Sequence, residues 1–163
     1  MKKIAKQIFV LLIACLFMCF VLCSCSKPKP EDGEECLSAT IDNLTIVAEF
    51  FSDYEYDNIF VRADDGTMTL LLKGEEKISD KTVVDAIKAL YDDGFKTITK
   101  SKENNAIAFL RWTKFNDFGA GLAYSIDKTK EPSVTYQTEL ISLSEDGWYY
   151  YESDYNEWRI NNR

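Results

Sequence analysis

Apolar residues recur every three or four positions in three stretches of the first hundred residues, which predicts amphipathic helices. The stretches are residues 37–51, 53–63 and 80–93. The second follows Ser52, which has Glu55 three residues later, the spacing of a capping box. The third is preceded by Ser79, a residue type that caps helices, and is followed by Gly94, which can close a helix in the left-handed conformation.

The stretch 53–63 has a second interpretation. Residues 58–63 can instead form a strand that turns at Asp64-Asp65-Gly66 into residues 67–73, as a β-hairpin. The capping box favours the helix, and residues 68–73 are expected to form a strand in either case.

From Phe95 onward the pattern becomes that of strands, with apolar and polar residues alternating and turn residues between the runs. The expected strands are residues 95–100, 106–113, 120–127, 134–143 and 147–153. Asp146-Gly147 marks a tight turn before the last of them. Helices followed by consecutive strands predict an α+β domain, with two to three N-terminal helices packed on an antiparallel sheet of five to six strands.

The N-terminus has a different pattern. Three lysines and no acid precede an apolar run from Ile8 to Leu22, which is the layout of a secretory signal peptide. A membrane-spanning helix needs about 20 apolar residues, and this run is shorter. The alternative, an uncleaved anchor helix, is less well supported because small residues follow the run at once.

The end of the run, Leu22-Cys23-Ser24-Cys25, resembles the lipobox of bacterial lipoproteins. The resemblance covers only the first 25 residues and implies that a diacylglyceryl group is attached to Cys25 after cleavage. A thiolate is the nucleophile suited to that step, and two acyl chains hold a protein on a membrane far more firmly than one. Cys15 also lies in a matching box and is the alternative, although cleavage there would leave an apolar segment on the mature protein.

The lipobox, the composition that follows it and the chain length together divide the chain into residues 1–24 as signal peptide, residues 25–36 as the lipidated cysteine with a flexible tether, and residues 37–163 as one domain. The tether is expected because residues 26–35 are rich in proline, charge and glycine. Of five cysteines, only Cys36 follows Cys25, so the mature chain cannot form an internal disulfide. This usage is typical of exported proteins of Gram-positive bacteria.

The net charge restricts the class of partner. Three of the 19 basic residues and none of the 27 acidic residues lie in the signal peptide, which leaves the mature chain with a net charge of −11. Such a charge argues against nucleic acids and anionic lipid surfaces as partners. It agrees with a solvated surface or with a basic partner.

The chain contains no histidine, which excludes Ser-His-Asp and Cys-His nucleophile systems and the usual zinc sites. Paired carboxylates remain available for glycan hydrolysis. Asp53, Glu55 and Asp57 have the alternate spacing of a calcium loop, but Asn58 replaces the glycine that such a loop requires. We therefore expect no metal and no cofactor.

A Ser-x-x-Lys spacing occurs at Ser125 and Lys128, as in penicillin-recognising enzymes. Those enzymes place the motif on a helix, whereas here it lies at the end of an expected strand. We do not expect it to be catalytic.

Aromatic residues are concentrated at the C-terminus. Trp148 and Tyr150 should face one side of the last strand, with Tyr149 and Tyr151 on the other. Burial of Trp148 in the core would leave an aromatic surface that can stack on sugars or on a protein. The candidate binding residues are Tyr149, Tyr151, Tyr155 and Trp158.

The sequence thus predicts a lipoprotein on the outer face of a bacterial cell membrane, whose domain is a non-enzymatic binding or accessory module. Its partners are the membrane, through the lipid, and a cell-envelope protein or glycan. One alternative is a small carboxylate-dependent enzyme that acts on cell wall or glycan. Another is an immunity-type or inhibitor protein for a basic partner.

Overall fold

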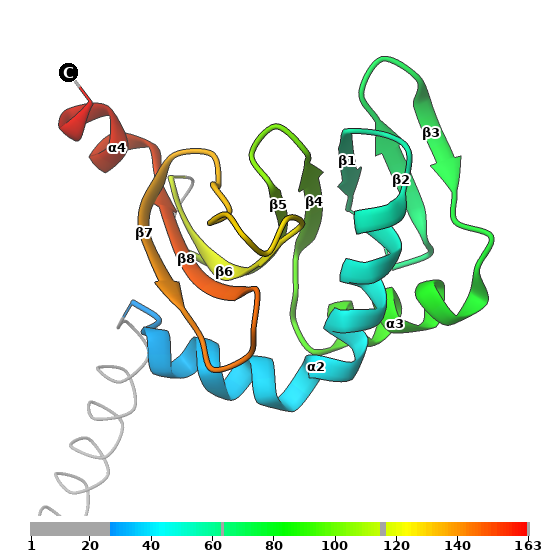
Figure 1. Cartoon of the computed structure of the whole chain (residues 1–163), viewed down its shortest axis with the longest axis horizontal. Coiled ribbons are helices and arrows are strands. Elements are labelled where there is room, and N and C mark those ends of the chain that lie inside the picture. The colour runs from blue at the N-terminus through cyan, green and yellow to red at the C-terminus, as the bar shows by residue number, and fades with distance from the viewer. Residues whose placement is uncertain (1–26, 63, 115–116, 163) are drawn as a thin grey trace, which may run out of the picture.

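A single curved antiparallel sheet forms the body of the protein (Figure 1). The computed structural model describes residues 27–62, 64–114 and 117–162. The predicted signal peptide, the lipidated Cys25 and its alternative Cys15 lie outside these residues. Within them, no helix is both long enough and apolar enough to cross a membrane.

The described residues form eight strands, in the spatial order β3-β2-β1-β4-β5-β6-β8-β7. Every neighbouring pair is antiparallel. The strands are β1 (Asn58–Val61), β2 (Thr67–Leu70), β3 (Gly74–Lys77), β4 (Thr97–Ser101), β5 (Ala106–Lys114), β6 (Phe118–Ser125), β7 (Gln137–Ser142) and β8 (Trp148–Asp154). The α+β class is confirmed, but the sheet has more strands than the five to six expected.

One of the additional strands replaces the helix expected over residues 53–63. The preceding helix continues through Asp53, and Ser52 donates its hydroxyl hydrogen bond to the Ala48 carbonyl at 2.8 Å, so Ser52 does not cap a new helix. Ile59 and Val61 point into the core, whereas Phe60 between them is 39% exposed. The β-branched residues therefore follow the period of two, and the hairpin interpretation was correct.

The other additional strand, β3, has the sequence Gly-Glu-Glu-Lys and lies at the edge of the sheet. It has no apolar alternation, so its sequence carries no strand signal. Charged residues on an edge strand discourage pairing with other chains.

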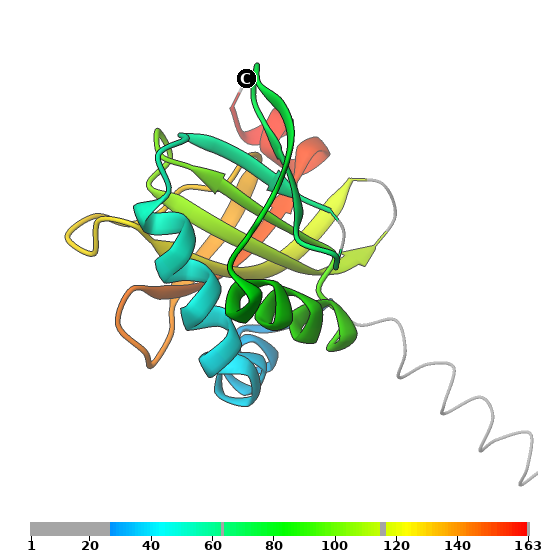
Figure 2. The same cartoon turned by 90° about the vertical axis from the view of Figure 1, so that its right-hand side faces the viewer.

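Two helices, α2 (Pro30–Asp53) and α3 (Lys81–Asp92), cover one face of the sheet, as Figure 2 shows. Between this face and the helices lies the main core. Its largest fully buried side chains include Phe51, Phe95, Phe109, Ile87 and Leu90. Ile87 and Leu90 lie on α3, which corresponds to the helix expected over residues 80–93. Asp80 rather than Ser79 caps this helix, accepting the backbone N–H of Thr82 at 2.8 Å.

α2 begins earlier than the sequence analysis expected. Residues 30–36, assigned there to the flexible tether, are helical, and both Gly33 and Cys36 are buried. Pro30 occupies the first position of the helix, where its missing N–H is not needed. The Asp32 carboxylate accepts the Lys29 backbone N–H at 2.7 Å. The tether interpretation is therefore wrong for this segment.

The opposite face of the sheet carries a smaller cluster, in which Tyr151 packs on Ala108 and Ala123. A short third helix, α4 (Tyr155–Asn161), follows β8 directly; the C-terminal segment was expected only as a tail. Figure 1 shows α4 at the end of the molecule where β7 and β8 lie.

Candidate functional site

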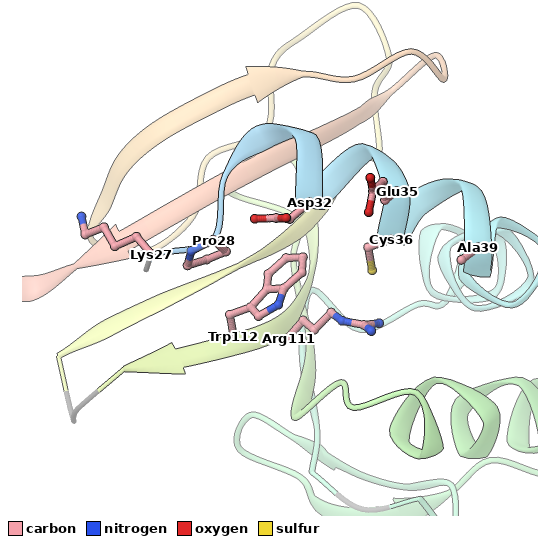
Figure 3. A pocket seen from close by; sticks show the side chains of 8 residues that line it. All are labelled: Lys27, Pro28, Asp32, Glu35, Cys36, Ala39, Arg111 and Trp112. Carbon is pink, nitrogen blue, oxygen red and sulfur yellow. The ribbon is translucent and has the colours of Figure 1, made fainter. Parts of the chain in front are cut away.

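A cavity of about 450 Å³ lies between the first turns of α2 and strand β5; we call it the α2–β5 cavity. It combines charged, aromatic and thiol groups (Figure 3). Its lining residues are Lys27, Pro28, Asp32, Glu35, Cys36, Ala39, Arg111 and Trp112. A volume of this size is in the range of small-molecule binding sites.

A β-bulge in β5 forms the floor of this cavity. Leu110 pairs with Gly121 and Trp112 pairs with Ala120, so Arg111 is an extra residue without a partner in the ladder. In a regular strand, Arg111 and Trp112 would point to opposite faces. The bulge lets both side chains line the same cavity, and bulges often redirect side chains in this way beside functional sites.

The bulge depends on the absence of a side chain at Gly121. A Cβ at this position would lie 2.0 Å from the Phe109 carbonyl oxygen and 3.1 Å from the Leu110 Cα. Both are backbone atoms, so neither can move aside without opening the ladder. Gly121 on β6 and the Arg111 guanidinium on the neighbouring strand β5 are thus parts of one local arrangement.

The Arg111 guanidinium is flanked by aromatic rings. Its Cζ lies 5.1 Å from the Phe95 ring centroid and 5.6 Å from the Trp112 ring centroid. Its Nη1 atom is buried and has no hydrogen-bond partner among the described residues. A buried donor without an acceptor costs about 1–3 kcal/mol, so an anionic or carbonyl group that bound here would relieve an unfavourable state.

Cys36 lies on α2 above the guanidinium, and Figure 3 shows its sulfur on the Arg111 side of the helix. Burial raises the pKa of the Cys36 thiol, while the nearby Arg111 acts in the opposite direction. A thiol that stays protonated is a poor nucleophile. Cys36 is therefore poorly suited to act as a nucleophile in this cavity.

The two acids of the cavity, Asp32 and Glu35, lie three residues apart on α2 and therefore on one face of the helix. Figure 3 shows Asp32 above the Trp112 ring and both acids on the opposite wall from Arg111. The cavity thus presents negative charge on the helix and positive charge on the strand.

The aromatic candidates from the sequence are only partly brought together. The predicted alternation in β8 is found, with Trp148 and Tyr150 on the helix-covered face. Tyr151 is 3% exposed and packs in the small cluster on the other face, so it cannot contact a partner. Tyr149 is half-buried against the same cluster.

Tyr155 and Trp158 do share a surface, and both pack edge-on against Tyr136, at ring centroid distances of 4.9 and 5.3 Å. Tyr136 and Tyr155 border a second hollow of about 730 Å³, and among the described residues that line it only Asp117 is charged. This hollow lacks the paired charges of the α2–β5 cavity.

The other motifs have structural explanations. Asp57 forms an ion pair with Lys102 at 3.5 Å, and the described residues contain no group of three potential metal ligands. The Ser125 hydroxyl lies 2.8 Å from the Asp127 carbonyl and accepts the Asn105 side-chain amide at 2.9 Å, so it holds a turn together.

Comparison of the chain with protein-family models, with curated proteins and with solved structures found no significant match to any of them.

Sequence reasoning missed the α2–β5 cavity because its parts are distant along the chain. The signals that were present were local: Lys29-Pro30-Glu31-Asp32 has the proline and the acids of a helix start, and Gly119 and Gly121 interrupt an otherwise regular strand. Neither signal identifies Arg111 and Trp112 as neighbours of α2.

Proposed function

We propose that this chain is a lipid-anchored binding module on the outer face of a bacterial membrane, and that the α2–β5 cavity binds a small ligand that carries an anionic group. The observation that carries the binding proposal is the Arg111 guanidinium. A bulge directs it into a cavity, and its Nη1 atom is buried without a hydrogen-bond partner among the described residues.

The charge and geometry of the cavity favour binding over the carboxylate-dependent enzyme. A glycosidase needs two carboxyl groups on opposite sides of the bond to be cleaved. Asp32 and Glu35 instead lie one turn apart on the same helix, so both approach a ligand from one side. The other alternative, a protein that inhibits a basic partner, is supported only by the net acidic charge of the chain.

Binding is tested by titrating the mature protein with inorganic phosphate at constant ionic strength, following tryptophan fluorescence, since Trp112 lines the cavity. We expect a saturable change that is lost in Arg111→Gln. The matched control is Arg62→Gln, because Arg62 is an exposed arginine directly after β1 that stacks on Phe60. An identical response in Arg111→Gln and in the unchanged protein would contradict the proposal.

The anchor is tested separately, by labelling producing cells with a radioactive fatty acid. Cys25→Ala should abolish the label, and Cys15→Ala should keep it. A label that persists in Cys25→Ala would assign the lipid to another cysteine.

A further inference from the structure

Lys27 and Pro28, which closely follow the proposed lipidation site, are packed against the domain. Lys27 pairs with Glu152 at 3.3 Å, and its Nζ lies 4.8 Å from the Phe118 ring centroid. The Pro28 carbonyl accepts the Tyr150 hydroxyl at 3.0 Å. Because two residues span at most about 7 Å, a lipid on Cys25 holds this end of the domain at the membrane surface.

The α2–β5 cavity lies at this same end. Lys27 and Pro28, the second and third residues after Cys25, are part of its lining. Because only a short segment separates the cavity from the proposed lipid, the headgroups of the membrane that holds the anchor are the molecules nearest to the cavity.

The two walls of the cavity carry opposite charges, so they favour a ligand that has both a negative and a positive group. Arg111 on β5 can bind a phosphate, for which guanidinium is well suited. Asp32 and Glu35 on α2 can bind an ammonium group, and the Trp112 ring between the walls can support it by a cation–π contact. A ligand with a single negative charge would leave the acidic wall unmatched.

We infer that the cavity binds a phosphodiester that carries a primary ammonium group, and that its source is a zwitterionic phospholipid headgroup of the membrane that holds the anchor. This inference rests on the proposed lipid anchor and binding site. It agrees with the overall charge, because a mature chain with a net charge of −11 is repelled by anionic lipid but not by a zwitterionic headgroup.

The test uses lipidated mature protein in nanodiscs and the rate at which a small neutral thiol reagent modifies Cys36. Cys36 is the only cysteine after Cys25 and lines the cavity, so a bound headgroup should shield it. One nanodisc contains phosphatidylethanolamine with phosphatidylglycerol. The other replaces phosphatidylethanolamine by the same amount of a neutral glucosyl diacylglycerol, which keeps the surface charge equal.

We expect modification to be about tenfold slower in the phosphatidylethanolamine discs, as when nine-tenths of the cavities are occupied. Arg111→Gln should abolish the difference in modification rate between the two kinds of disc, and Arg62→Gln should keep this difference. Glu35→Gln, at an exposed position of α2, should also lose the difference in rate between the two kinds of disc. This variant keeps the test decisive if Arg111→Gln does not fold.

Equal rates in the two kinds of disc would overturn the inference, and the phosphate titration would still decide the proposed function. A third arm adds soluble glycerophosphoethanolamine to protein in the glycolipid discs. Protection in this arm together with protection by the lipid supports the inference. If the soluble compound slows the modification of Cys36 and the lipid does not, the ligand does not come from the membrane and the inference is overturned.

Discussion

Gly33 on α2 lies directly against the ring of Tyr150 on β8, and a Cβ at Gly33 would come 2.8 Å from Cδ2 and 3.2 Å from Cβ of the tyrosine. Tyr150 is fully buried, and its hydroxyl also contacts the Pro28 carbonyl and the Glu152 carboxylate. A single tyrosine thus joins the start of the domain to its last strand. These contacts show that residues 28–33 are packed on the domain rather than forming a tether.

The contact predicts that Gly33→Val lowers the free energy of unfolding by about 2 kcal/mol, because the added side chain meets a ring that cannot move. The matched control is Ser38→Val, at an exposed position of the same helix. It carries the same cost of a β-branched residue without the clash. Urea unfolding of both variants measures the difference, and equal losses would show that Gly33 does not pack on Tyr150.

Removal of residues 26–36 should lower the melting temperature markedly, rather than leave it unchanged as a flexible tether would. The truncation deletes the Lys27–Glu152 pair, the hydrogen bond from Tyr150 to Pro28, and the buried Cys36. We expect a loss of about 2 kcal/mol or more, which corresponds to several degrees. Calorimetry of the truncated and complete mature chains provides the measurement. A shift of less than a degree would contradict the packed start of α2.

Gly121→Ala should destabilise the domain by about 3 kcal/mol, because the new methyl group would overlap the Phe109 carbonyl at 2.0 Å. The control is Gly74→Ala, where φ is +99° but an added Cβ would meet no atom of the described residues within 4 Å apart from those of its chain neighbours. That variant should lose only about 1 kcal/mol, the cost of a left-handed alanine. Similar losses in both would mean that the β5 bulge can relax.

Leu90→Ala should cost about 2–5 kcal/mol, because Leu90 is fully buried between α3 and the core. This is a large part of the total stability of a domain of this size. Lys88→Ala, on the exposed side of the same helix, should change the stability little. Chemical denaturation of the two variants is the check.

Alkaline pH should weaken the domain partly through Tyr91. Burial raises the pKa of Tyr91 to about 12, and its hydroxyl donates to the Val61 carbonyl at 2.9 Å. In the unfolded chain the same group ionises near pH 10. Its contribution to stability is therefore fully present below about pH 10 and is lost as the pH rises through about 12, because the unfolded state releases its proton first.

Tyr91→Phe should accordingly make the free energy of unfolding depend less steeply on pH between about pH 10 and 12. At neutral pH this variant should lose about 1 kcal/mol of stability, because the hydrogen bond is lost. Tyr136→Phe, at an exposed tyrosine, should keep the steepness of the unchanged protein. An unchanged slope in Tyr91→Phe would show that this hydroxyl does not contribute.

Local patterns in the sequence were sufficient for most elements and failed where two patterns overlapped. The period-two alternation identified β5, β6 and β8, and the helical period identified α3 and the middle of α2. Around residues 53–63 a capping box and a strand pattern were both present. Contacts of Ile59 and Val61 with the core, which no local pattern contains, decided for the strand.

The signal peptide pattern, the charge of the mature chain, the lack of histidine and the α+β class all follow from the sequence alone, because each depends on composition or on neighbours along the chain. The α2–β5 cavity does not, because Arg111 lies 75 residues after Cys36 along the chain and the two meet only when α2 packs on the sheet. The tertiary structure also decided that Tyr151 is buried and that residues 30–36 belong to a packed helix. Burial and packing depend on which surfaces contact each other in the folded protein, and one local sequence pattern is compatible with many tertiary arrangements.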